Sequence, residues 1–181
     1  DTVNKIRGDI GTTVKVTVLR GTDVKDFSIT REKITAPSVV SRMDGTIGII
    51  TMSRFDDTTA DLARAAAQDF KNKGATGVIL DLRGNGGGLL TAAQDVAGLW
   101  LDNEVVVSER TGGKVTDELK SGSDTVLKGI PTVVLVDGSS ASASEIVAGA
   151  LQDHNAATLI GEKTFGKGSV QKLINLPNGS V

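Results

Sequence analysis

The sequence predicts an α/β fold in which helices cover a largely parallel sheet. From residue 37 onward, short apolar runs alternate with longer stretches in which apolar residues recur every three or four positions. The short runs have the length of buried strands, and the longer stretches have the period of amphipathic helices. Tight loops rich in glycine or serine follow several of the runs. Strand, loop and helix in repetition indicate a parallel sheet with helices packed on it.

The beginning of the chain is predicted to be a separate, β-rich segment. Valines alternate with polar residues over positions 14–18, which is the period of a half-buried strand. A second strand is expected over residues 26–34, and Pro37 marks a linker. We therefore expect two parts, residues 1–36 and residues 37–181.

The second part carries the predicted α/β core. Apolar periodicity and capping signals place helices at residues 58–74, 89–100 and 145–152. Strands are expected at residues 47–55, 78–80, 105–107, 132–136, 157–160 and 169–176. The polar stretch 111–128 is expected to be a loop. A turn signal at residues 177–179 calls for a further strand after it, so we expect this core to be incomplete at its C-terminus.

The composition excludes several kinds of catalytic site. The chain has no Cys and one His, so a Cys nucleophile, a Cys-ligated metal, a disulfide scaffold and a multi-His metal site are impossible. Any catalysis by histidine must use His154. Hydroxyls, carboxylates, amines and the backbone remain as catalytic groups.

The charge balance argues against nucleic acid or acidic lipid as the main partner. Lys and Arg together number 20, and Asp and Glu together number 22. A protein that binds a polyanion normally carries a clear excess of positive charge. The sequence also has no run of about 18 apolar residues and no signal peptide.

Residues 84–88 form the first loop that could carry chemistry. Its glycines allow positive φ angles and a close approach of the backbone to a ligand, and its N–H groups could bind an anion or an oxyanion. The dinucleotide-binding fingerprint fails, because Leu89 stands where its final glycine is required. The alternative is a tight turn between strand and helix.

Residues 139–145 form the second loop, which is rich in serine. Small residues before an apolar helix are typical of a capping segment, with Ser144 as the N-cap. The functional interpretation is a serine nucleophile near a helix N-terminus, where the helix dipole favours negative charge.

Residues 161–168 form the third loop. It nearly matches a phosphate-binding P-loop, but Gly168 stands where a Ser or Thr should hold the metal. A strand is expected after it, whereas a P-loop begins a helix. The alternative is a surface turn with a solvated lysine.

His154 follows Asp153 at the end of a predicted helix. A cation at that position suits the helix dipole, so a structural role is favoured. A role as the base for a serine stays open, although adjacent Asp and His side chains do not readily form a triad.

Taken together, the three loops resemble the motifs of the carboxyl-terminal processing proteases, which are also called tail-specific proteases. The motifs lie at residues 81–88, 140–146, 150–153, 161–162 and 165–171. Their order, spacing and composition all agree with the family. Residues 1–36 look like the back half of the PDZ domain that precedes the core in this family, so the resemblance covers nearly the whole chain.

The resemblance implies a fold and a set of site residues. The fold is a core similar to crotonases and Clp-type proteases, with sheet and covering helices, behind a partial PDZ segment. The implied activity is that of a serine endopeptidase that cleaves proteins near their C-termini through an acyl-enzyme. By motif position, Ser142 is the nucleophile, Lys167 the base and Gln171 the residue that orients the lysine. Further positions associated with activity in the family are Glu145, Asp153 and Thr164.

The Ser–Lys chemistry is physically consistent with the composition. A serine hydroxyl is a weak nucleophile that needs an adjacent base. A lysine serves as that base when burial lowers its pKa from about 10.4. We expect Phe165 to help exclude water from Lys167. The amide of Ala143, with one from Gly87 or Gly88, would then hold the oxyanion.

Two alternatives to this enzyme remain. The first is a non-catalytic or resting peptide-binding member of the same fold, against which the presence of both Ser142 and Lys167 argues. The second is an acyl-CoA enzyme, because a crotonase-like core also presents backbone oxyanion holes. Such an enzyme would not need Lys167 and Gln171 four residues apart on one strand, where both side chains share a face.

The resemblance also implies partners and a compartment. The expected partners are protein or peptide C-termini, with room for a homo-oligomer or a regulatory partner; no nucleic acid, metal or cofactor is implied. A complete PDZ domain binds a C-terminal carboxylate at a backbone loop. We expect that loop in the first half of the domain, which the resemblance places before residue 1. The family is extracytoplasmic, in the bacterial periplasm or cell envelope, and membrane association is expected only through a segment absent from this chain.

Overall fold

A computed structural model describes residues 6–33 and 36–170 of the chain. The chain divides into two units, Asp1–Pro37 and Ser38–Val181. The division falls directly after Pro37, where the sequence places a linker.

The first unit contains a two-stranded hairpin. Strand β1 (Thr13–Arg20) pairs antiparallel with β2 (Asp23–Thr30) along their whole length. Gly21 has a φ of 65° in the connecting turn, which a glycine adopts without strain. Strand β2 begins at Asp23, three residues before the start expected at residue 26. That this hairpin belongs to a PDZ domain stays a prediction.

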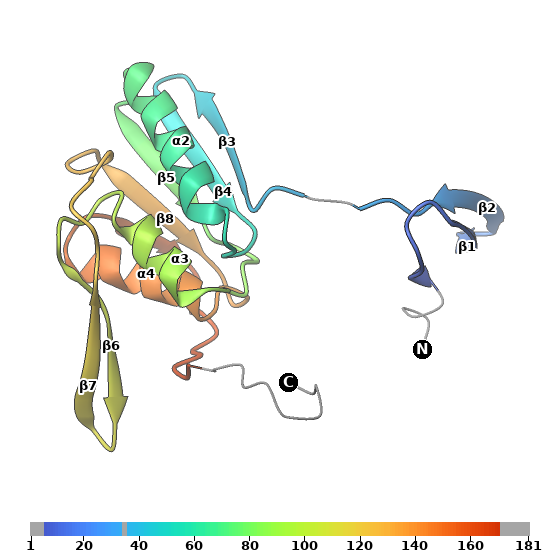
Figure 1. Ribbon diagram of the computed structural model, residues 1–181. Helices are drawn as coiled ribbons and strands as arrows, with labels where there is room; N and C mark the ends of the chain where they lie inside the picture. Colours follow the sequence, from blue (N-terminus) through green and yellow to red (C-terminus); the bar gives the residue numbers. More distant parts are fainter. Residues whose placement is uncertain (1–5, 34–35, 171–181) are drawn as a thin grey trace. The chain divides into compact units, whose positions relative to one another are not determined.

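The second unit is built on a five-stranded sheet (Figure 1), in the order β3-β4-β5-β8-β9. Strands β4 (Ile47–Met52), β5 (Gly77–Asp81), β8 (Thr132–Val136) and β9 (Thr158–Gly161) run parallel, as the sequence predicts. Strand β3 (Val39–Asp44) pairs antiparallel with β4 at one edge and was not predicted. Gly45, with a φ of 58°, makes the turn between these two strands.

Three helices connect the parallel strands: α2 (Thr59–Asn72), α3 (Leu90–Ala97) and α4 (Ala143–Asp153). The parallel strands follow one another across the sheet in chain order, and crossovers of this kind are right-handed. All three helices therefore lie over the same face of the sheet (Figure 1). The loops that follow the carboxyl ends of the four parallel strands lie at one edge of the sheet. In the described part of the chain, no helix is both long and apolar enough to cross a bilayer.

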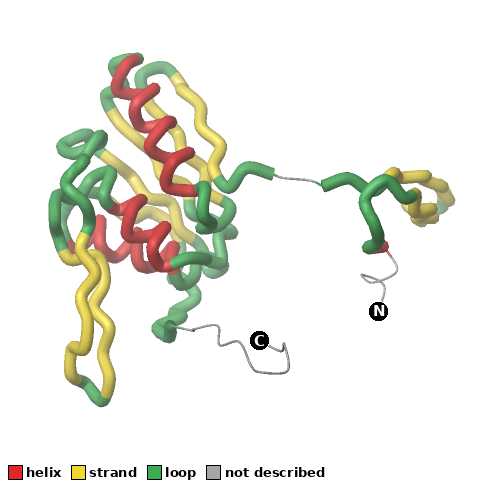
Figure 2. The backbone as a smooth tube through the Cα atoms, in the orientation of Figure 1, coloured by secondary structure: helices red, strands yellow, loops and turns green. Residues whose placement is uncertain are grey.

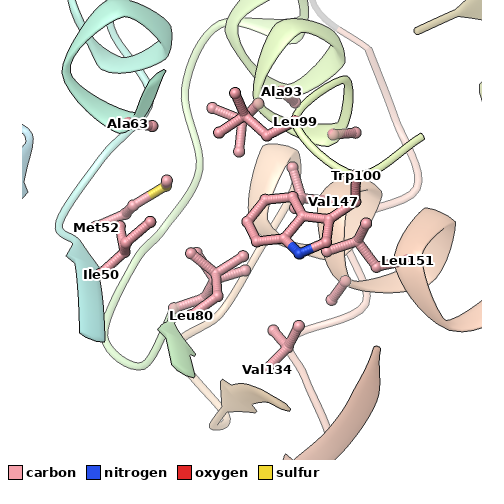
Figure 3. Packing of buried hydrophobic residues seen from close by; sticks show 14 of the residues in the cluster. Ile50, Met52, Ala63, Leu80, Ala93, Leu99, Trp100, Val134, Val147 and Leu151 are labelled. Carbon is pink, nitrogen blue, oxygen red and sulfur yellow. The ribbon is translucent and has the colours of Figure 1, made fainter. Parts of the chain in front are cut away.

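The core lies between the sheet and these helices (Figure 3). Alternate residues of each strand face the helices, and Ile50, Leu80 and Val134 are fully buried there. The single Trp, Trp100, is also buried, and its indole N–H donates to Thr132 Oγ1 at 2.8 Å. This hydrogen bond satisfies the one polar atom of the Trp side chain inside an apolar environment.

A second hairpin corrects the sequence prediction. Strands β6 (Val105–Thr111) and β7 (Lys114–Lys120) pair antiparallel and extend away from the sheet and helices (Figure 2). The prediction of a loop at 111–128 was wrong for β7, whose side chains are mostly exposed and polar and so show no apolar alternation. Gly112 and Gly113, both with positive φ, make the two-residue turn. This pair of glycines was the sequence feature that could have predicted the hairpin.

The strand expected at 169–176 falls mostly outside the described residues. Ser169 and Val170, at its start, are not in a strand.

Gly48 provides a test of the packing between sheet and helix. A Cβ at this position would overlap the ring of Phe70, which is fully buried on α2. We expect Gly48→Ala to lower the free energy of unfolding by about 1–3 kcal/mol, measured by urea denaturation, because overpacking forces the ring to move.

Gly149 is the matched control for this substitution. It lies in α4, and a Cβ there would meet nothing within 4 Å. Gly149→Ala should therefore raise stability by up to about 1 kcal/mol, since alanine is the better helix former. Equal effects of the two substitutions would contradict the packing described here.

Candidate active site

Four loops converge at the carboxyl edge of the sheet. They follow β4, β5, β8 and β9, and backbone hydrogen bonds join them. The amide of Phe55 donates to the carbonyl of Gly87 at 3.0 Å, and the amide of Phe165 donates to the carbonyl of Ser140 at 3.0 Å. The amide of Gly84 donates to a carboxylate oxygen of Asp137 at 3.0 Å. The three loops singled out in the sequence are therefore neighbours in space.

The alternating serines of residues 140–144 have different roles. Ser140 and Ser144 are fully buried. Their hydroxyls donate to the carbonyls of Leu82 at 2.8 Å and Asn85 at 2.9 Å. These two serines hold the loop to its neighbour. Ser142, between them, is only half-buried and is the serine of the three that a substrate can reach.

Ser142 has an unusual backbone conformation. Its φ is 54° and its ψ is −116°, and it is the N-cap of α4. The interpretation of Ser144 as the N-cap was therefore wrong, because the helix begins one residue before it. Among the described residues, the other non-glycine residues with positive φ are Asn103 and Asn155, and asparagine adopts such angles more easily. A strained serine at the start of a helix is typical of a catalytic nucleophile.

Gly87 makes room for this turn. Its φ is 97°, and a Cβ on it would lie 2.6 Å from the carbonyl oxygen of Ala141 and 2.8 Å from Cβ of Ser142. The glycine loop therefore packs directly on the Ser142 turn. This close approach explains why the loop is rich in glycine.

The carboxylate of Glu145 joins the Ser142 turn to the loop after β9. It accepts hydrogen bonds from the amide of Ser142 at 2.8 Å and from the hydroxyl of Thr164 at 2.8 Å. It also accepts the amides of Gly166 at 2.6 Å and Lys167 at 2.9 Å. The structure thus brings together Ser142, Glu145, Thr164 and the backbone of Lys167.

These hydrogen bonds determine the charge state of Glu145. Burial alone would raise the pKa of its carboxyl. The hydroxyl of Thr164 and the amides of Lys167, Ser142 and Gly166 together outweigh burial and hold the pKa below its usual value. In the folded protein Glu145 is therefore ionised at neutral pH.

The surroundings of Lys167 differ from expectation. Lys167 is exposed, and Phe165 is 69% exposed instead of shielding it. The cause is the orientation of the loop, whose amides and Thr164 hydroxyl point toward Glu145 and leave the Phe165 side chain at the surface. Gln171, the predicted orienting residue, lies outside the described residues.

The structure distinguishes between the candidate oxyanion donors. The amide of Gly87 donates to Oδ1 of Asn85 at 2.9 Å, so it is already engaged. Among the described residues, no hydrogen bond uses the amide of Gly88 or that of Ala143. Of the predicted donors, Gly88 and Ala143 are therefore the two whose amides have no partner among the described residues; Gly88 is exposed and Ala143 is fully buried.

Asp153 and His154 lie away from this cluster. They stand at the end of α4, an 11-residue helix whose N-cap is Ser142. At 1.5 Å per residue, the helix separates them from Ser142 by about 17 Å. The ring Nε2 of His154 lies 2.8 Å from the carbonyl oxygen of Val105, where β6 begins. The structure therefore assigns His154 a structural contact and does not bring Asp153 to the serine.

Asn85 is a site residue that sequence reasoning missed. It is fully buried, and it contacts both the glycine loop and the serine loop. A single asparagine within a run of glycines was the available signal, because a turn does not need a buried amide side chain.

The described residues offer no obvious place for a metal ion. They contain no group of three or more His, Cys, Asp or Glu side chains with suitable geometry. Two hollows, of about 650 and 370 Å³, lie elsewhere on the second unit, and neither is lined by Ser142 or Lys167.

Comparison with known proteins identifies the family of this chain. Residues 46–181 match the model of "Peptidase family S41". A "Probable CtpA-like serine protease" from Staphylococcus haemolyticus is 38% identical over 99% of this chain and 36% of its own length. The protein of the same name from Staphylococcus aureus is 39% identical over the whole chain and 37% of its own length. The chain thus spans about a third of the length of these relatives.

A solved structure is also similar to this chain. A photosystem II D1 C-terminal processing protease superposes with a TM-score of 0.75 at 29% identity, over 95% of this chain and 49% of that one. The α/β core with its covering helices is therefore confirmed as the fold of this family.

The bonds to Glu145 predict a pH-dependent contribution to stability. Because folding lowers the pKa of this carboxyl, the stabilisation is present above its unfolded value of about 4.3 and is lost as pH falls through the folded value. The stability difference between wild type and Glu145→Gln, measured by urea unfolding, should be largest near neutral pH and shrink on acidification. A difference that does not change with pH would contradict the role of the carboxylate.

The same substitution should slow the reaction of Ser142 with a fluorophosphonate probe. A glutamine cannot accept all of these hydrogen bonds, and each bond to a charged group contributes about 1.5–3 kcal/mol, so we expect a fall of about 10-fold or more. Glu162→Gln is the control, since Glu162 is an exposed glutamate at the start of the same loop. Equal probe reactivity of both variants would contradict this assignment.

Gly87 provides an independent test of the contact between the glycine loop and the serine turn. Gly87→Ala should abolish most probe labelling, because its Cβ would press on Ser142 and its φ is unfavourable for alanine. Gly86→Ala should be tolerated, since a Cβ there meets nothing within 4 Å. If both variants label like wild type by gel fluorescence, the packing of the two loops is wrong.

Proposed function

The chain belongs to peptidase family S41, and on this premise we propose that it carries the catalytic core of a serine endopeptidase. The proposed enzyme cleaves protein substrates near their C-termini through a Ser142–Lys167 dyad and an acyl-enzyme intermediate. The observation that carries the proposal is the conformation of Ser142. It is a strained, accessible serine at a helix N-terminus, flanked by two serines that are buried and bonded.

The proposed reaction begins with proton transfer. Lys167 Nζ takes the proton of the Ser142 hydroxyl as Oγ attacks the carbonyl carbon of the scissile peptide bond. The carbonyl oxygen becomes an oxyanion, and the amides of Ala143 and Gly88 donate to it. When the intermediate collapses, the C–N bond breaks and Lys167 returns the proton to the leaving amine. Water then attacks the acyl-enzyme by the same steps and releases Ser142.

The position of Lys167 supports its role as the base, with one condition. Its amide shares the carboxylate of Glu145 with the amide of Ser142, which links the backbones of base and nucleophile. Lys167 is exposed, so a bound substrate has to cover it before the site excludes water. A bound peptide is the group available to displace that water, and Gln171 would orient the amine.

The proposal that cleavage occurs near C-termini is supported by one similar solved structure. The D1 protease that superposes on this core is named for C-terminal processing, and it is 29% identical. The staphylococcal relatives are named only as serine proteases. We propose a protein or peptide C-terminus as the substrate, a homo-oligomer or regulatory partner as the assembly, and the bacterial periplasm or cell envelope as the compartment.

One observation favours a second candidate, a resting form of the same enzyme. The exposure of Lys167 and Phe165 is what a site would have before a substrate or partner completes it. In this form the serine turn is assembled, and the lysine is brought to Ser142 only on binding.

Two substitutions test the dyad. With a fluorophosphonate probe and a peptide substrate, Ser142→Ala should remove all labelling and cleavage. Lys167→Ala should lower the rate of acyl-enzyme formation by about 10²- to 10⁴-fold, which is the usual contribution of a general base.

His154→Ala is the control, because His154 lies at the other end of α4. It should leave both the labelling and the cleavage rates close to wild type. Labelling that persists in Ser142→Ala, or activity that is lost in His154→Ala, would overturn the proposed assignment.

A further inference from the structure

Asn85 connects three segments of the candidate active site. Its side-chain amide donates to the carbonyl of Met52 at 3.0 Å, and its Oδ1 accepts the amide of Gly87 at 2.9 Å. Its backbone carbonyl accepts the amide of Ala141 at 3.1 Å and the hydroxyl of Ser144 at 2.9 Å. The residue therefore holds the end of β4, the glycine loop and the serine turn together, and it is fully buried.

The two sets of bonds act on different groups of the site. The backbone carbonyl accepts hydrogen bonds from Ala141, which precedes Ser142, and from Ser144, which follows it by two residues. It therefore supports the strained turn from both sides. The side chain instead determines how the amides of the glycine loop are used. Since Oδ1 occupies the amide of Gly87, that amide is not available to a substrate oxygen.

The neighbouring amide of Gly88 has a different orientation. Phe55 forms an isolated parallel bridge with Gly88 by bonding to the peptide groups on either side of it, the carbonyl of Gly87 and the amide of Leu89. In such a bridge the central residue directs its own N–H away from its partner. The amide of Gly88 therefore points away from Phe55 and has no hydrogen-bond acceptor among the described residues.

We propose that Asn85 is a positioning residue of the reaction, which fixes the Gly87–Gly88 backbone so that the amide of Gly88 faces the oxyanion. The inference rests on the proposed acyl transfer at Ser142. Asn85 touches neither the substrate nor the reacting atoms and acts through the glycine loop. Its effect belongs to the transition state, because the oxyanion donors contribute most when negative charge develops on the carbonyl oxygen.

The experiment measures kcat and KM for a peptide substrate with Asn85→Ala in the full-length protein. We expect kcat to fall by about 10²-fold, the usual cost of one oxyanion donor, with little change in KM. The affinity of a peptide boronate, which mimics the tetrahedral intermediate, should fall in parallel with kcat/KM. The affinity of an unreactive peptide of the same sequence should not change.

Asn85→Asp provides a second variant in case the alanine variant does not fold. A protonated Asp can donate to the carbonyl of Met52 and accept the amide of Gly87, as Asn does, whereas a carboxylate would place a second acceptor against the carbonyl of Met52. The kcat of Asn85→Asp relative to wild type should therefore rise as pH is lowered.

Thr132→Ala is the matched control, because it removes the buried hydrogen bond between Thr132 and Trp100. Thr132 is the first residue of β8, and the candidate site lies beyond the last. It should lower stability without lowering kcat. Equal loss of kcat in Thr132→Ala and Asn85→Ala, or a wild-type kcat in both Asn85 variants, would overturn the positioning role. Failure of wild-type protein to react with the fluorophosphonate would instead refute the proposed acyl transfer itself.

Discussion

The carboxylate of Glu145 is the interaction on which the candidate site depends. It accepts the amide of Ser142, and it also accepts the hydroxyl of Thr164 and two amides of the loop that carries Lys167. Segments about 20 residues apart thereby share one half-buried charge. Each of these hydrogen bonds to a charged acceptor is stronger than one to a neutral acceptor, so the loop and the serine turn stabilise each other's positions. The link to Lys167 runs through its backbone amide and does not involve its side chain.

A second constraint is the strain at Ser142, which the surrounding loops have to hold. Residues with such φ and ψ values persist only where neighbouring contacts determine them. Here the neighbours are Gly87, which leaves space for the turn, and the carbonyl of Asn85, which bonds on both sides of it. The topology makes this possible, because parallel strands in chain order bring all of their following loops to one edge of the sheet. The fold thus positions the serine before any substrate arrives.

The sequence predicted the α/β architecture, and the periodicity of apolar residues explains why; its assignment of the catalytic residues stays a prediction. Buried strands and amphipathic helices leave strong patterns, so the parallel strands and the three covering helices were found. Strand β7 was missed because an exposed ribbon has no apolar alternation. The roles of Asn85 and Glu145 were beyond the sequence for a different reason. Their partners are mainly backbone amides and carbonyls, which every residue has and no motif records.

The most direct test of the central claim is a crystal structure of the full-length protein after reaction with a peptidyl phosphonate. We predict a bond from phosphorus to Oγ of Ser142, with Lys167 Nζ within hydrogen-bond reach of that oxygen. The phosphoryl oxygen should lie about 3 Å from the amides of Ala143 and Gly88. An adduct on another serine, or a phosphoryl oxygen bound to the amide of Gly87 in place of Gly88, would contradict the account.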